Sequence, residues 1–172
     1  MIRDKRAIFT ALTILLAGYA GAPPAQAQNQ EPPTAAEMVT DYLKQDIFLE
    51  PGVGLKSVRI GTSFAQVRQE WGAPTRTDRH DLIDEKWIYE IADHTRIALI
   101  GGDSVEAIRV EGSFNSPYGT TEGASFGMPR HQLATIYGAG KSGSNNLTYD
   151  KRGVGFVLRQ GQVSEIRIFP PD

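Results

Sequence analysis

The most informative absence in the sequence is cysteine, which occurs at none of its 172 positions. No disulfide can staple the chain, so the fold must rest on a hydrophobic core, which a chain of this length can build. A lipid anchor on a cysteine is excluded for the same reason. We therefore expect a form without a lipid anchor.

Long hydrophobic runs are also scarce. The longest, at 7–19, is shorter than the about 20 residues that a membrane-spanning helix needs. It follows three basic residues within the first six positions and precedes Ala25-Gln-Ala27, an order that is typical of a secretory signal peptide. We expect cleavage of 1–27 near Ala27, which leaves a periplasmic or secreted chain without a transmembrane segment.

The chain also lacks an excess of basic residues. The expected signal peptide holds three basic residues and one acidic residue, so the remaining chain has 15 Lys and Arg against 19 Asp and Glu. Nucleic-acid-binding domains usually carry a basic patch or a basic excess. The negative balance therefore argues against nucleic acid as a partner.

Residues 28–53 are expected to form a linker with one short helix. Adjacent prolines and polar residues at 28–33 are typical of a spacer. Thr34 and Glu37 make a capping-box pattern, and apolar residues follow it at helical spacing through 34–43. This helix either docks on the rest of the chain or binds a partner, and the sequence leaves both alternatives open.

The chain does contain an internal repeat. Residues 61–74, GTSFAQVRQEWGAP, align without a gap with residues 127–140, GMPRHQLATIYGAG. The first and twelfth positions are glycine in both copies, and Trp71 aligns with Tyr137. Because a repeat of this kind fixes the architecture, we expect repeat units at 54–112 and 113–172.

Each copy of the motif predicts a short helix. In the first copy, Ser63 and Gln66 form a capping box, and Gly72 suits a left-handed C-cap. In the second copy, Pro129 suits the first helical turn and Gly138 is the expected C-cap.

Three extended runs follow each expected helix, after a polar loop that spans 75–86 in the first copy. The runs are 86–91, 95–100 and 105–111, then 147–150, 154–159 and 163–169. One such unit leaves its sheet uncovered and is marginal in water. The expected fold class is therefore α+β, with two tandem units of one helix and a three-stranded antiparallel meander that form one sheet with both helices on one face.

These motifs resemble those of a known family. A helix opened by Gly61-Thr-Ser63 and closed by Trp71-Gly-Ala-Pro74, followed by a Trp87-Ile-Tyr89 strand and a terminal Val105-Glu-Ala-Ile-Arg-Val110 strand, resembles the BamE (SmpA/OmlA) outer-membrane assembly lipoproteins. The tandem arrangement over 54–169 is similar to the β-lactamase inhibitor protein fold, which implies an open concave sheet face that grips an enzyme. The chain departs from the lipoproteins because it lacks their anchored cysteine and has two expected units instead of one.

Motifs for catalysis, cofactors or metals are weak. Residues 138–142 end like a phosphate-binding loop but follow a helix and lack its first glycine. The 78–85 cluster, which includes His80, Asp81 and Asp84, has metal-ligand residue types without the spacing of a metal site, so a surface loop is the simpler interpretation. Ser63 lacks the second glycine of a nucleophile elbow. We assign no catalytic, cofactor-binding or metal residue.

The sequence therefore predicts a non-enzymatic protein that binds another envelope or secreted protein. Aromatic and arginine residues are the usual anchors of protein interfaces, and strand alternation places several arginines on the sheet face away from the helices. The predicted partner-binding residues are Trp87, Tyr149, Arg109, Arg159 and Arg167. The sequence does not decide on which sheet face the two aromatic residues lie. The alternatives are an inhibitor of a secreted hydrolase and, less favoured, a small hydrolase that uses carboxylates of the 78–85 loop.

Overall fold

The computed structural model describes residues 46–80, 84–91 and 94–172. The expected signal peptide at 1–27 and the expected helix at 34–43 lie outside these residues, as does most of the linker.

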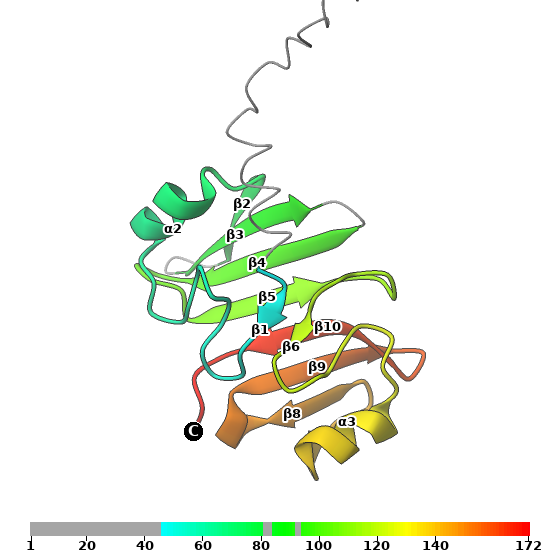
Figure 1. Cartoon of the computed structure of the whole chain (residues 1–172). Helices are drawn as coiled ribbons and strands as arrows, with labels where there is room; N and C mark the ends of the chain where they lie inside the picture. Colours follow the sequence, from blue (N-terminus) through cyan, green and yellow to red (C-terminus); the bar gives the residue numbers. More distant parts are fainter. Residues whose placement is uncertain (1–45, 81–83, 92–93) are drawn as a thin grey trace, which may run out of the picture. The chain divides into compact units, whose positions relative to one another are not determined.

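The main element is one antiparallel sheet of eight strands (Figure 1). The strand order is β2-β3-β4-β5-β10-β9-β8-β7. The strands are β2 (Arg76–His80), β3 (Asp84–Ile91), β4 (Thr95–Gly101), β5 (Ala107–Glu111), β7 (Lys141–Ser142), β8 (Asn146–Tyr149), β9 (Val154–Arg159) and β10 (Gln162–Ile168). The last strand of the first half, β5, pairs with the last strand of the chain, β10, so the two halves join at the middle of the sheet.

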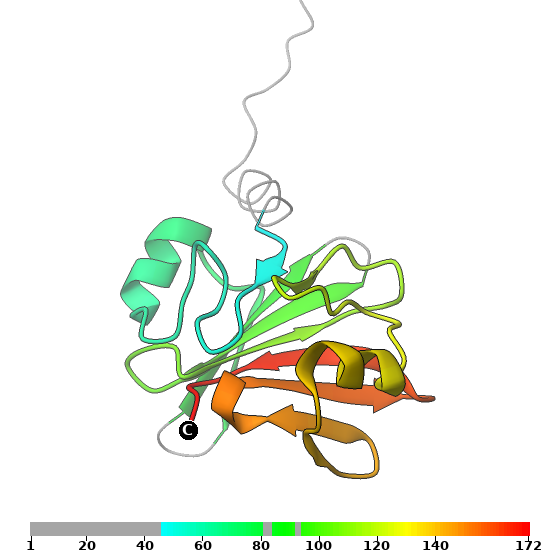
Figure 2. The same cartoon turned by 60° about the horizontal axis from the view of Figure 1, so that its bottom comes forward.

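Two short helices and a small second sheet accompany the main sheet. The helices are α2 (Phe64–Trp71) and α3 (Arg130–Tyr137), and a 3-10 helix, η1 (Asp150–Arg152), follows β8. The short strands β1 (Phe48–Leu49) and β6 (Gly119–Thr120) pair in parallel. Figures 1 and 2 show α2 beside the first half of the main sheet and α3 beside the second half, with β1 and β6 between them.

The predicted fold class of two tandem units, each with one helix and a three-stranded meander, is wrong. The described chain is mainly β, with two helices of 8 residues beside a single sheet of eight strands. Residues 76–80, expected in a polar loop, form β2, and Lys141–Ser142 form β7. Both segments are polar, so their sequences lack the apolar alternation that identifies a strand. They are strands because their backbones pair with β3 and β8, and this pairing cannot be read from the local sequence.

Matching contacts hold the two helices against the sheet. The rings of Trp71 and Tyr89 lie 5.1 Å apart, and those of Tyr137 and Tyr149 lie 5.0 Å apart. The Tyr89 hydroxyl donates to the Gly72 carbonyl at 3.2 Å, and the Tyr149 hydroxyl donates to the Gly138 carbonyl at 3.4 Å. The repeated sequence motif therefore corresponds to a repeated set of contacts.

The helix ends agree with the sequence in part. The predicted capping box of Ser63 and Gln66 is confirmed. The C-cap glycines Gly72 and Gly138 have φ of 74° and 78°, but their ψ values of −162° and −153° lie outside the left-handed helical region. They occupy a region of the backbone map that is essentially open to glycine alone.

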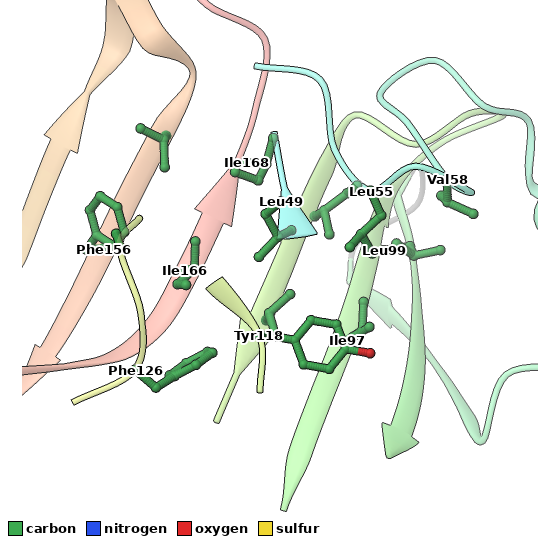
Figure 3. Packing of buried hydrophobic residues seen from close by; sticks show 14 of the residues in the cluster. Leu49, Leu55, Val58, Ile97, Leu99, Tyr118, Phe126, Phe156, Ile166 and Ile168 are labelled. Carbon is green, nitrogen blue, oxygen red and sulfur yellow. The ribbon is translucent and has the colours of Figure 1, made fainter. Parts of the chain in front are cut away.

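The core fills the space between the two helices on one face of the sheet. In Figure 3, Leu49, Leu55 and Val58 from the first segment and Tyr118 and Phe126 from the middle of the chain pack over the sheet residues Ile97, Leu99, Ile166 and Ile168. All of these side chains are at most 3% exposed. The buried residues of α2 and α3 belong to the same cluster, so both helices, β1 and the 112–129 segment cover the same face.

Candidate functional site

The strand register separates the two faces of the main sheet. Residues directly opposite each other on neighbouring strands point to the same face. One row across six strands contains Trp87, Leu99, Ile108, Ile168, Val154 and Tyr149, all buried in the core. This row faces α2 and α3, so the residues that alternate with it point to the opposite face, which we call the open face.

Trp87 and Tyr149 therefore lie on the helix-covered face, which corrects their predicted place in a partner site. The Trp87 ring packs 4.8 Å from the Phe64 ring, and its indole nitrogen donates to the Glu85 carboxylate at 2.9 Å. Trp87 is 8% exposed and Tyr149 is 6% exposed. A protein that docks on the open face cannot reach either ring.

The middle of the open face carries basic residues without an acidic residue in the same row. Arg109 on β5 lies directly opposite Arg167 on β10. The row continues through neighbouring register pairs across all eight strands: Arg76, Ile88, Ala98, Arg109, Arg167, Gly155, Thr148 and Lys141. Like charges directly opposite each other are unfavourable in a sheet, so a counter-charge beside this pair is expected.

The two central arginines differ in what they contact. The Arg167 guanidinium donates to the Glu165 carboxylate on its own strand. Arg109 is half-buried and makes no hydrogen bond or ion pair within the part of the chain that the structure describes. Its guanidinium is therefore available to a group from outside.

Small residues flank the arginine pair on both sides. Ala98 on β4 lies opposite Arg109, and Gly155 on β9 lies opposite Arg167. A Cβ atom at Gly155 would lie 3.8 Å from the Arg167 Cβ and 3.4 Å from the Phe169 ring, so this ring lies close to the glycine. Ala98 is 3% exposed and Gly155 is buried, so both flanks of the arginine pair are covered by neighbouring groups.

The next row of the open face is mixed in charge. Glu90, Arg96, Glu111 and Glu165 lie opposite one another in turn across four strands. Arg96 pairs with Glu111 at 3.2 Å, and both side chains are more than a third exposed. These partly exposed pairs add little stability. The row is mainly acidic and lies beside the basic row, with Glu111 directly opposite Glu165.

Arg159, the remaining predicted anchor, lies apart from the other two arginines. It ends β9, four residues beyond Gly155, and is exposed at the turn into β10. At about 3.3 Å per residue, the separation along the strand is about 13 Å. The structure thus brings Arg109 and Arg167 together and leaves Arg159 at the end of the strand.

The weaker sequence motifs have local structural roles where they are described. Asp78 pairs with Arg76 at 3.0 Å, and Glu85 accepts from Arg79 at 3.5 Å as well as from Trp87. Asp81 lies outside the described residues. Within the described ranges no group of three or more acidic, histidine or cysteine side chains is placed to hold a metal ion. The phosphate-loop alternative fails, because Lys141 and Ser142 form strand β7.

The sequence alone did not predict which residues lie beside the two arginines on the open face. Ala98 and Gly155 matter only because of the register that brings them beside the arginines. A glycine inside a strand often marks a close approach of another group, and Gly155 in the 154–159 run is such a glycine.

None of the helices in the described residues is long and apolar enough to cross a membrane.

Comparisons with known proteins identify no family. No family model matches the chain, and no curated protein matches it. A solved structure is similar: the 1.5 Å crystal structure of an extracellular protein containing an SCP domain from Bacillus anthracis strain Ames. The identity is 13% with a TM-score of 0.44, and the match covers 64% of this chain and 44% of that one, so the chain spans less than half of that protein. The resemblance to the BamE lipoproteins and the inhibitor fold stays a prediction.

Proposed function

We propose that this chain is a non-enzymatic binding protein whose open face docks an acidic surface of a second exported protein. The observation that carries the proposal is the opposed pair Arg109 and Arg167, in which the Arg109 guanidinium has no hydrogen bond or ion pair among the described residues.

The chemistry of the arginine pair supports a carboxylate as the recognised group. A guanidinium presents a planar fork of donors that matches a carboxylate in two parallel hydrogen bonds. Arginine is also one of the residues most enriched among interface anchors. Arg109 and Arg167, which lie directly opposite each other on neighbouring strands, suit one or two acidic side chains on a partner.

The size of the open face supports a macromolecular partner. Eight strands at the usual spacing of about 4.8 Å extend about 34 Å across the sheet. With central strands of five to eight residues, the face measures about 700 Å². A standard protein interface buries about 800 Å² on each partner, so the face is large enough for one.

Export of the chain is part of the proposal. It rests on the signal-peptide pattern of 1–27 and places the partner in the periplasm or outside the cell. The resemblance to the β-lactamase inhibitor protein fold adds the alternative that the partner is a secreted hydrolase. The two versions use the same face and differ in the partner, so one experiment separates them.

The test uses the tagged chain, produced from residue 1 in its native cells, with chemical cross-linking and mass spectrometry. The Arg109→Glu/Arg167→Glu variant reverses the charge of the row, and Lys56→Glu/Arg59→Glu makes the same charge change in a segment that packs on the helix-covered face. We expect one stoichiometric partner that is lost in the first variant and kept in the second.

The identity of the captured partner then decides between the inhibitor version and the scaffold version of the proposal. A hydrolase whose activity falls on binding establishes the inhibitor version, and a partner without such activity establishes the scaffold version. Equal capture by both variants, or a second copy of the chain as the only cross-linked protein, would refute the proposal.

A further inference from the structure

The two central arginines of the open face belong to similar strand segments. Residues 105–110, VEAIRV, and 163–168, VSEIRI, share their apolar positions and have Arg109 and Arg167 at the fifth position. The register places these two arginines directly opposite each other on β5 and β10. The difference between the two segments therefore shows what Arg109 lacks.

The third position of each segment decides the partner of its arginine. Side chains two residues apart on a strand point to the same face. On β10 this position is Glu165, whose carboxylate accepts from the Arg167 guanidinium. On β5 it is Ala107, whose methyl group accepts no hydrogen bond. Arg109 therefore lacks the carboxylate that holds Arg167.

The nearest other carboxylates are bound to different arginines. Glu111, two residues after Arg109, accepts from Arg96 at 3.2 Å. Glu165 is held by the arginine on its own strand. Glu90 lies on β3, two strands from β5, and is 4.0 Å from Arg96. Within the part of the chain that the structure describes, Arg109 is thus left without a carboxylate.

The surface over Ala107 is partly exposed. Ala107 and its register partner Ile100 on β4 are half-buried, whereas Ala98 beside Arg109 is 3% exposed. The Phe169 ring, which follows β10, lies 3.4 Å from the position of a Cβ atom at Gly155 on β9. It therefore lies on the side of β10 away from β5. A group from outside can approach Arg109 over Ala107.

We infer that Arg109 binds one carboxylate of the partner, over Ala107, in the position that corresponds to the Glu165 carboxylate beside Arg167. The recognised group is the side chain of one aspartate or glutamate, which the planar fork of the guanidinium matches. Ala107 determines specificity because its methyl group leaves this position unfilled. The inference rests on the proposed function for the existence of the partner.

The geometry is tested without a partner by Ala107→Glu, which supplies the carboxylate from within the chain. Carbon-13 NMR follows the titration of the introduced carboxyl group. Its pKa should lie about 0.2–0.7 lower in Ala107→Glu than in Ala107→Glu/Arg109→Gln, the range for an exposed ion pair. Unchanged melting temperatures would show that both variants are folded. Equal pKa values would overturn the inference, whether or not a partner is found.

Cross-linking and mass spectrometry in the native cells test the binding role of the same position. Ala107→Glu should reduce the captured partner about tenfold or more, the scale of a lost hydrogen bond to a charged group. The introduced carboxylate occupies Arg109 and repels the carboxylate of the partner. Ala107→Gln, which has nearly the same size and no charge, should retain most of the capture. Arg109→Gln removes the guanidinium itself and should lose as much as Ala107→Glu.

The outcomes separate this inference from the proposed function. Capture that Ala107→Glu leaves unchanged, or an equal loss with Ala107→Gln, would overturn the inference and leave the proposed function in place. Unchanged capture by Arg109→Gln would overturn both. If the unsubstituted chain captures no partner, the proposed function is refuted, and the titration still decides whether Arg109 binds a carboxylate over Ala107.

Discussion

Replacing Gly138 by alanine is the cleanest test of how the repeated motif ends its helices. Gly138 has φ of 78° and ψ of −153°, and its N–H donates to the Ala134 carbonyl at 2.9 Å. A Cβ atom added there meets no atom within 4 Å. The substitution therefore introduces no clash, and its whole cost is the strain of holding an alanine in a conformation that is essentially restricted to glycine.

The expected loss is about 1–3 kcal/mol of unfolding free energy, the usual cost of one strained backbone position. Urea unfolding should show a lower midpoint with an unchanged slope, because the surface exposed on unfolding stays the same. Gly138→Val should lose at least as much, since a β-branched residue is still less tolerant of positive φ.

Gly143→Ala is the matched control for this experiment. Gly143 lies outside the positive-φ range, and the nearest atom to an added Cβ is the Asn146 Cβ at 3.9 Å. Alanine there should leave stability unchanged or raise it by about 0.4–1 kcal/mol, because it restricts the unfolded chain. If Gly138→Ala and Gly143→Ala had the same effect, the assigned C-cap of α3 would be wrong.

Two further predictions concern the core and its tyrosines. Ile166→Ala, at a position that is 0% exposed, should cost about 2–5 kcal/mol in urea unfolding, and a loss below about 1 kcal/mol would contradict the close packing of β10. Tyr137 should make stability fall as pH rises from about 10 to about 12, because the raised pKa keeps it protonated in the folded state while the unfolded chain releases its proton. Tyr137→Phe should show a smaller fall in the urea midpoint over this pH range, and an identical fall would exclude the tyrosine as its source.

The helices and most core strands could be predicted from local sequence patterns. Apolar spacing and the Ser63 capping box identified α2, and apolar alternation identified runs that correspond to β4 and β9. These signals are local, since each depends on residues within one turn or one strand. Predictions based on these signals therefore do not depend on how distant parts of the chain fold.

The strand pairings and the side of each aromatic residue needed the structure. Trp87 and Arg109 come from strands separated by β4, and only the register shows that they point to opposite faces. Segments such as 76–80 become strands because a neighbour offers hydrogen-bond partners, and polar side chains give no sign of this. The structure places the two predicted aromatic residues on the helix-covered face and Arg109 and Arg167 on the opposite face, and their role in binding stays a prediction.

The pairing of β5 with β10 has a consequence for how the chain reaches its folded state. Glu111 on β5 lies opposite Glu165 on β10, 54 positions later in the sequence. During synthesis the first half can form its strands well before the last strand has emerged, and β5 is then an unpaired edge in the middle of the future sheet. Exposed strand edges promote association between chains. The interval before β10 arrives is therefore the stage at which this protein is most prone to aggregate.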